Sequence, residues 1–349
     1  MDELIVRAGR HLRSRVLTNV EYQGHFLPIK ACYFGSERPD VPVLAFVGGV
    51  HGIERIGSQV VLAFMETLVK RLEWDDSLIR GLEHLRLLFI PVLNPVGLIR
   101  KSRANGAGVD LMRNAPVDAD TSVPFLVGGQ RLSARLPWYR GRRNAPMQPE
   151  SAALCEAINA ELANAPFVLS VDVHSGYGVK DQLWFPLACS YQPVENLPEI
   201  YSLFELLQDT YPNLNYLIEP QSHQYLTHGD LWDHLYLTSR EGAAVFLPLT
   251  LEMGSWNWVR KNWRQTGSFA GWFNPVKPHR IQRVLRRHTV LFEFLLRATR
   301  AYGNWLPGEL SREKCRQKAL QMWYNARERN DQGDGEMRRE PRSGNSVEE

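Results

Sequence analysis

Residues 46–60, FVGGVHGIERIGSQV, join an apolar stretch to a His-x-x-Glu pair and then to a segment with helical spacing. The pattern predicts a strand over 43–49, a turn, and a helix over 56–73, because apolar residues recur at helical intervals in the last part. His51 and Glu54 fall in the turn, and both residue types are ligands of zinc. The motif alone leaves two interpretations open, a metal site and an ordinary turn with a capping glutamate.

The rest of the chain repeats this alternation of strand and helix. Apolar runs predict further strands over 26–33, 85–95, 167–176 and 242–254. Helical spacing predicts helices over 150–163, near 197–210 and around 279–301. The alternation indicates an α/β fold, specifically a three-layer sandwich in which helices flank a mixed, mostly parallel sheet.

The chain carries no clear internal linker before its C-terminal part. We therefore expect one catalytic domain over 1–308, followed by a helical extension over 309–328. Residues 329–349 are charged and poor in apolar groups, so they bury too little surface to offset their ordering entropy. We expect this tail to be disordered.

Composition excludes several classes of protein. The 41 basic and 38 acidic residues give a formal charge of +3, which is too small for a typical nucleic-acid binder. The charged first 16 residues contain no apolar core of a secretory signal, and no run of 18 apolar residues could span a membrane. The four cysteines form no C-x-x-C pair and are expected to be reduced thiols: Cys32, Cys155, Cys189 and Cys315. These features predict a cytoplasmic protein, and they say nothing of its oligomeric state.

Two distant residues follow other predicted strands. His174 ends the apolar run VLSVDVH, and Glu252 lies near the end of 242–254, before a glycine. Open α/β sheets bind ligands beyond the carboxyl ends of their strands, so both side chains are expected to share a crevice with His51. A metal site is now favoured over an ordinary turn. Glu252 is suited to act as a general base that takes a proton from water. The alternative interpretation of Glu252 is a surface carboxylate at the end of a strand.

Arginines are concentrated between these segments, in residues 94–116. Guanidinium groups stay charged and grip carboxylates in a bidentate fork. Arg103 and Arg113 are therefore candidates for polarising a scissile carbonyl and for holding an anionic substrate. The alternative is a solvated basic loop.

An ordered series of short motifs then suggests a family. The motifs are HGIE (51–54), NPVG (94–97), RANGAGVDLMRN (103–114), YRG…PE (139–150), DVHSG (172–176), YLTHGDLWDHLY (225–236) and TLEMG (250–254). Together they resemble the zinc carboxypeptidase family, the relatives of carboxypeptidases A and B. The resemblance spans roughly residues 44–256 and implies the same fold.

The resemblance also implies a catalytic centre with one zinc ion per chain. His51, Glu54 and His174 match the zinc ligands. Asp110 matches the carboxylate that accepts a hydrogen bond from the first ligand histidine, an interaction that fixes ring orientation. Glu252 matches the general base. Arg103 matches the residue that, with zinc, stabilises the oxyanion of the tetrahedral intermediate.

Substrate recognition follows the family pattern only in part. Arg113 matches the clamp for a terminal carboxylate, and Tyr225 matches a mobile tyrosine that closes over substrate. The family usually has Asn before the clamping Arg, whereas this chain has Met112, which removes a hydrogen bond of about 0.5–1.5 kcal/mol. In the segment of the specificity pocket, Trp232 is expected to narrow the pocket and Asp230 to attract a cationic side chain.

The motifs and the resemblance together predict a zinc-dependent, carboxypeptidase-like hydrolase. It would cleave an amide bond next to a carboxylate-bearing residue in a peptide or an amino-acid conjugate, with no nucleic-acid or membrane partner. Without an evident signal or pro-segment, the chain resembles bacterial cytoplasmic relatives that cleave murein peptides or amino-acid conjugates more than it resembles the secreted digestive members. Two alternatives remain open: an N-acyl-amino-acid deacylase of the aspartoacylase or succinylglutamate desuccinylase type, and a zinc-binding module without catalysis.

Overall fold

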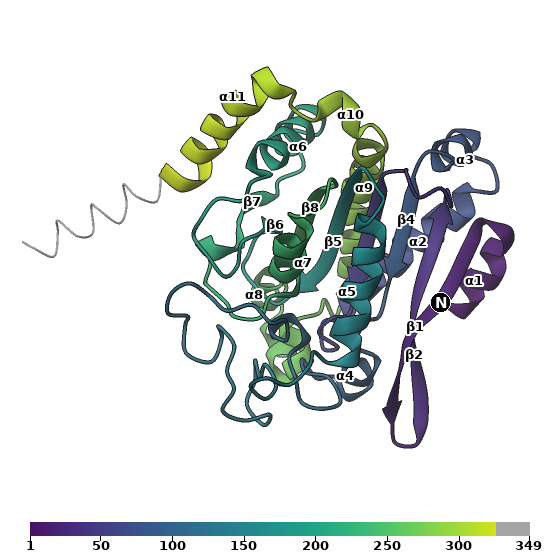
Figure 1. Cartoon of the computed structure of the whole chain (residues 1–349). Coiled ribbons are helices and arrows are strands. Elements are labelled where there is room, and N and C mark those ends of the chain that lie inside the picture. Colours follow the sequence, from purple (N-terminus) through teal and green to yellow (C-terminus); the bar gives the residue numbers. More distant parts are fainter. Residues whose placement is uncertain (326–349) are drawn as a thin grey trace, which may run out of the picture.

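An eight-stranded sheet forms the centre of the computed structural model, which describes residues 1–325 (Figure 1). The strand order is β1-β2-β4-β3-β5-β8-β6-β7. The strands are β1 (Leu12–Tyr22), β2 (His25–Gly35), β3 (Val43–Gly48), β4 (Arg86–Ile90), β5 (Phe167–Ser175), β6 (Gln182–Phe185), β7 (Leu217–Pro220) and β8 (Val245–Met253). Strands β4, β3, β5 and β8 run parallel, as does the pair β6–β7, while β1, β2 and the β6–β8 contact are antiparallel.

Helices cover both faces of the sheet. They are α1 (Asp2–Ala8), α2 (Arg55–Arg71), α3 (Asp76–Leu82), α4 (Pro95–Arg100), α5 (Pro149–Leu162), α6 (Leu197–Thr210), α7 (Leu231–Ser239), α8 (Trp256–Arg260), α9 (Pro278–Arg300), α10 (Tyr302–Trp305) and α11 (Glu309–Ala319). Helices α2 and α9 pack on each other and on β3 and β5, whereas α5 and α7 form a second pair that contacts β5 and β8 (Figure 1). The predicted α/β sandwich with a mixed, mostly parallel sheet is confirmed.

The core explains why the central strands read as unbroken apolar runs. Every residue of β3 and β5 is buried, as expected for parallel strands that helices cover on both sides. Phe46 of β3 lies against Phe64 of α2 and Phe292 of α9, with ring centroids 5.3 and 4.4 Å away. These contacts tie two helices that are distant in sequence to one strand and so hold its carboxyl end in place.

The predicted elements agree with the structure except at some ends and at the sheet edges. The predicted strand over 85–95 ends early, at Ile90, because residues 91–94 turn toward α4 and Asn94 caps that helix by accepting from Gly97 N. The strand predicted over 242–254 is shorter at both ends, spanning β8. Strands β1, β6 and β7 were not predicted. β1 is mostly exposed and shows no regular alternation, and the other two have four residues each.

The C-terminal extension packs on the domain. Helix α11 lies against α6, and Trp323 is buried against Phe185, Tyr201 and Phe204. The end of the predicted extension and the tail predicted over 329–349 lie outside the described residues. No helix among residues 1–325 has the length and apolar character needed to cross a membrane.

Candidate active site

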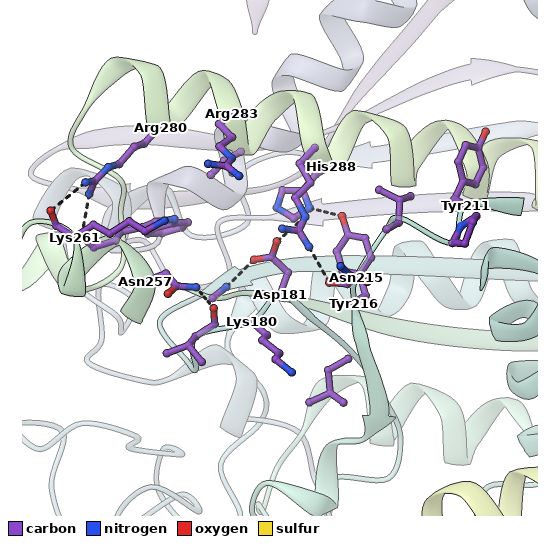
Figure 2. A pocket seen from close by; sticks show the side chains of 18 of the residues that line it. Lys180, Asp181, Tyr211, Asn215, Tyr216, Asn257, Lys261, Arg280, Arg283 and His288 are labelled. Carbon is purple, nitrogen blue, oxygen red and sulfur yellow. Dashed lines mark hydrogen bonds and ion pairs between the residues drawn. The ribbon is translucent and has the colours of Figure 1, made fainter. Parts of the chain in front are cut away.

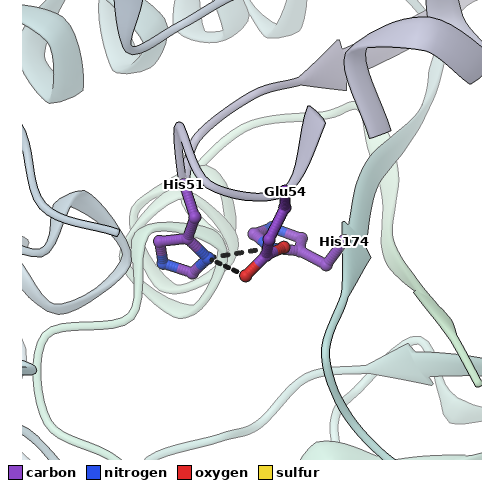
Figure 3. Close-up of side chains that lie close together, drawn as sticks. All are labelled: His51, Glu54 and His174. Carbon is purple, nitrogen blue, oxygen red and sulfur yellow. Dashed lines mark hydrogen bonds and ion pairs between the residues drawn. The ribbon is translucent and has the colours of Figure 1, made fainter. Parts of the chain in front are cut away.

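Three predicted ligands converge at the carboxyl edge of the sheet. His51 follows β3, Glu54 precedes the first turn of α2, and His174 lies in β5 next to its end. All three side chains are buried, and their ligand atoms lie within 4.8 Å of one another (Figure 3). His51 Nδ1 lies 2.9 Å from Glu54 Oε1 and 3.2 Å from His174 Nδ1, and His174 Nδ1 lies 3.1 Å from Glu54 Oε2.

The loop that carries His51 is held by the NPVG motif. Leu93 N and Asn94 N donate to the carbonyls of Gly48 and Gly49, at 3.0 and 2.9 Å. Gly52 faces the start of the next helix so closely that a Cβ atom there would lie 1.9 Å from the carbonyl carbon of Gly97. This position therefore admits only glycine, which explains the HG pair in the motif.

The outer nitrogens of both histidines face carboxylates. His51 Nε2 lies 3.0 Å from Oδ1 of Asp110, and His174 Nε2 lies 2.8 Å from Oδ2 of Asp172. We assign the ring protons to these Nε2 atoms, so that both Nδ1 lone pairs point at each other and at Glu54. Three acceptor atoms about 3 Å apart need a cation between them. In a tetrahedral zinc site with zinc–nitrogen bonds of about 2.05 Å, neighbouring ligand atoms lie about 3.4 Å apart, which is close to the observed spacing. The residues fit a zinc ion.

The charges around this group also favour a cation. Burial alone would raise the pKa of Glu54, but the two histidines beside it outweigh that effect and hold the pKa below its ordinary value. Burial would lower the pKa of His174, yet Asp172 and Glu54 raise it well above the usual range. Three carboxylates thus surround the two imidazoles, with Arg103 as the guanidinium that faces them. The groups around the two imidazoles are therefore predominantly negative, which favours the binding of a cation.

Glu252 lies on the neighbouring strand, directly opposite His174 in the β5–β8 register. Its Oε1 accepts a hydrogen bond of 2.9 Å from the backbone N–H of Tyr177. Burial, followed by the negative charge of Glu54, raises the pKa of Glu252 to about 8. A carboxyl group with such a pKa can both take up and release a proton near neutral pH, as a general acid–base needs.

Arg103 and Asp110 reinforce the metal-ligand group. Arg103 Nε donates to Oδ2 of Asp110 at 2.7 Å, and its Nη1 lies 3.4 Å from Oε1 of Glu54. The buried Asp110 has a pKa well below its ordinary range, because Arg103 and His51 outweigh the effect of burial. Arg103 is thereby anchored with its guanidinium beside Glu54.

Arg113 is buried but has no carboxylate partner. Among residues 1–325, no ion pair includes it, and its guanidinium contacts only the carbonyls of Val127 and Met112, each at 3.4 Å. The Tyr225 ring lies 6.0 Å from the guanidinium carbon, within cation–π range. The charge of Arg113 is felt by the buried carboxylates of Asp230 and Asp110, but within residues 1–325 it makes no direct ion pair. Such a guanidinium is suited to an anionic group of a ligand.

One cavity of about 830 Å³ connects these groups. Nine of the predicted site residues line it: His51, Glu54, Arg103, Asp110, Met112, Arg113, His174, Tyr225 and Glu252. Apolar and aromatic side chains, including Trp184 and Phe273, form much of the remaining wall. Such a cavity has the size and the mixture of apolar walls and few polar groups typical of small-molecule sites.

Two predicted pocket residues lie elsewhere. Asp230 is the N-cap of α7 and accepts from the backbone N–H groups of Trp232 and Asp233 at 2.9 and 3.1 Å. Trp232 is buried and donates from Nε1 to Oδ2 of Asp172 at 2.9 Å. Neither lines the cavity, so the expected narrowing of the pocket and attraction of a cation do not fit their positions.

Asp172, whose carboxylate connects Trp232 to His174, was not among the predicted site residues. A signal was available in the motif DVHSG. Residues i and i+2 of a strand point to the same face, so Asp172 necessarily lies beside the ligand histidine on that face.

Comparisons with known proteins agree with this geometry. The zinc carboxypeptidase family matches residues 8–264, which is most of the chain. This chain belongs to the zinc carboxypeptidase family, a family of metallopeptidases. In the fold, carboxypeptidase A from Helicoverpa armigera is similar with a TM-score of 0.65 and 19% identity, covering 86% of this chain and 71% of that chain.

Two curated relatives match shorter stretches. Carboxypeptidase D of Drosophila melanogaster is 29% identical over 151 residues, which are 41% of this chain and 9% of the relative. The catalytic chain of carboxypeptidase N from Rattus norvegicus is 27% identical over 187 residues, which are 48% of this chain and 36% of the relative. The matched region thus spans about a third or less of these relatives.

Proposed function

We propose that this chain is a zinc-dependent hydrolase that cleaves an amide bond next to a carboxylate-bearing residue. The observation that carries the proposal is the position of Glu252, opposite His174 in the strand register and in one cavity with His51 and Glu54. A structural metal site needs no buried carboxyl group beside its ligands. A hydrolytic site does, because a proton must be taken from water and returned to the leaving amine.

Each group has a role in this reaction. His51, Glu54 and His174 would hold zinc, which would supply Lewis-acid polarisation of the scissile carbonyl. Glu252 takes a proton from the attacking water and passes it to the leaving nitrogen. Arg103, anchored on Asp110, directs its guanidinium toward the negative charge that develops on the carbonyl oxygen.

Arg113 and Tyr225 bind the substrate in this proposal. The unpaired guanidinium of Arg113 holds the substrate carboxylate, and the Tyr225 ring covers it from one side. The apolar Met112 lines the same cavity and offers no side-chain hydrogen bond to that carboxylate. This supports a peptide or amino-acid conjugate whose carboxylate is held mainly by Arg113. A murein peptide is one such substrate.

A deacylase of N-acyl amino acids is the second candidate, and Met112 favours it because a small acyl conjugate makes less demand on a carboxylate clamp. For the compartment we propose the cytoplasm, supported by four free cysteines, since oxidising compartments favour disulfides.

The test combines a substrate panel with a variant of the base. Zinc-loaded protein is assayed on peptides with a free C-terminus, γ-D-glutamyl-diaminopimelate peptides and N-acyl amino acids. We expect hydrolysis in one of the two peptide classes, and a loss of about 10²–10⁴-fold in kcat in Glu252→Gln at unchanged zinc content and melting temperature. Hydrolysis confined to N-acyl amino acids would replace the peptidase by the deacylase, and no hydrolysis of any class would refute an enzymatic function.

A further inference from the structure

A second cavity, of about 1030 Å³, lies beside α9 and shares no lining residue with the first. Its walls are α9, the segment 211–217 after α6, residues 179–181, and residues 254–261 around α8 (Figure 2). Figure 2 shows Arg280, Arg283 and Lys261 together at one end and Tyr211 at the other.

The lining of this cavity is basic. Five of its side chains are Lys or Arg and two are Asp, which gives a formal charge of +3 with neutral histidines: Lys180, Lys261, Arg280, Arg283, Arg287, Asp181 and Asp209. The whole chain of 349 residues also has a formal charge of only +3. The residues outside this cavity therefore sum to a formal charge of zero.

Most of this charge is not neutralised within the protein. Asp181 pairs with Arg287 at 3.0 Å, and its other oxygen accepts from Gly254 N at 2.9 Å. Arg280 donates to the carbonyls of Trp258 and Lys261, which carry no charge. Within residues 1–325, Lys261, Arg280 and Arg283 form no ion pair.

The position of these cations on α9 is unfavourable for the helix itself. Arg280 and Arg283 lie in the first two turns, where the helix dipole is positive, and the first turn contains no acidic residue. Arg280, Arg283 and Arg287 are also spaced three and four residues apart, so they repel one another. The helix gains no stability from this arrangement, whereas an anion at this end would interact favourably with the cations and the dipole.

We propose that this cavity binds a small molecule that carries phosphate groups. Phosphate matches clustered guanidinium and ammonium groups because it offers several charged acceptor oxygens at once. The end of the cavity at Tyr211, Pro212 and Leu214 offers aromatic and apolar side chains and can accommodate an organic portion of the ligand. Binding here requires neither metal nor turnover, so it is independent of the proposed hydrolysis.

The test measures binding by calorimetry at fixed ionic strength, with ADP as the probe and adenosine as its uncharged counterpart. Arg283→Gln removes a cation inside the cavity, and Arg286→Gln removes an exposed cation of the same helix outside it. We expect ADP to bind, adenosine not to bind, and the Kd for ADP to rise about tenfold in Arg283→Gln but less than twofold in Arg286→Gln. Lys261→Gln, on a different segment, is expected to weaken binding by a similar factor.

Several results would overturn the proposal. These are no binding of ADP at millimolar concentration, equal binding of adenosine, or equal weakening by Arg283→Gln and Arg286→Gln. Citrate binding as tightly as ADP, with the same loss in Arg283→Gln, would replace phosphate by carboxylate as the recognised group. The melting temperature of each variant verifies that it is folded, and these exposed substitutions are expected to leave it unchanged.

Discussion

Asp172 offers a sharp test of how the metal-ligand group is held. Its carboxylate lies 2.8 Å from Nε2 of His174, the nitrogen that faces away from Glu54, and accepts from the indole of Trp232. The substitution Asp172→Asn keeps the shape and replaces a charged acceptor by a neutral one. His174 then becomes a weaker ligand, because the negative charge that raises its basicity is gone.

The magnitude follows from the contact of 2.8 Å between the Asp172 carboxylate and Nε2 of His174. A bond to a charged group stabilises by about 1.5–3 kcal/mol and a neutral one by about 0.5–1.5 kcal/mol, so the substitution costs on the order of 1–1.5 kcal/mol. Since 1.4 kcal/mol corresponds to about a tenfold change in an equilibrium constant, we expect the Kd for zinc to rise about tenfold.

The assay is competition for zinc with a chromophoric chelator at pH 7.5. Ser170→Ala is the matched control, because Ser170 is buried on the same face of β5, two residues before Asp172, and its hydroxyl has no hydrogen-bond partner among residues 1–325. We expect that control to bind zinc as the wild type does. A Kd in Asp172→Asn within twofold of the control would refute the reasoning.

Two further predictions concern stability. Burial lowers the pKa of His288 to about 4, whereas the pKa of a histidine in the unfolded chain is about 6.5. Between pH 4 and pH 6.5 the unfolded chain therefore binds a proton at this residue that the folded protein does not bind. The stability that this group contributes is present above pH 6.5 and is lost as the pH falls, by about 1 kcal/mol between pH 7.5 and 5.5. Urea denaturation should show that His288→Gln loses less stability over this interval than the wild type. Equal losses in the two proteins would contradict the prediction. Trp323→Ala should lower the free energy of unfolding by about 3–5 kcal/mol, because the indole is buried against the domain. Leu310→Ala, in the same extension but 99% exposed, should change it little, and a similar effect of both would indicate that the extension does not pack on the domain.

The convergence of His51, Glu54 and His174 was predictable because it depends on local chemistry and on a general property of sheets. His51 and Glu54 are three residues apart in one turn, and a parallel sheet brings the carboxyl ends of distant strands to one edge. The same property placed His174 and Glu252 in one crevice, as the β5–β8 register shows. These residues needed no knowledge of tertiary packing.

Asp230 and Trp232 could not be placed in the same way. Both lie at the start of α7, and the direction of a side chain there depends on how the helix packs on the sheet. In the structure the indole of Trp232 points inward and donates to Asp172, the carboxylate that faces His174. The β1–β2 hairpin was partly missed for a different reason, because an exposed strand such as β1 lacks the alternation that marks a half-buried one.

Zinc binding by His51, Glu54 and His174 is tested by the zinc content of the purified protein, measured by mass spectrometry for the wild type and for His174→Ala after loading and gel filtration. If His51, Glu54 and His174 hold the ion, the wild type retains one zinc per chain and the variant, left with two ligands, retains almost none. Equal zinc in both proteins, or none in the wild type, would contradict the account.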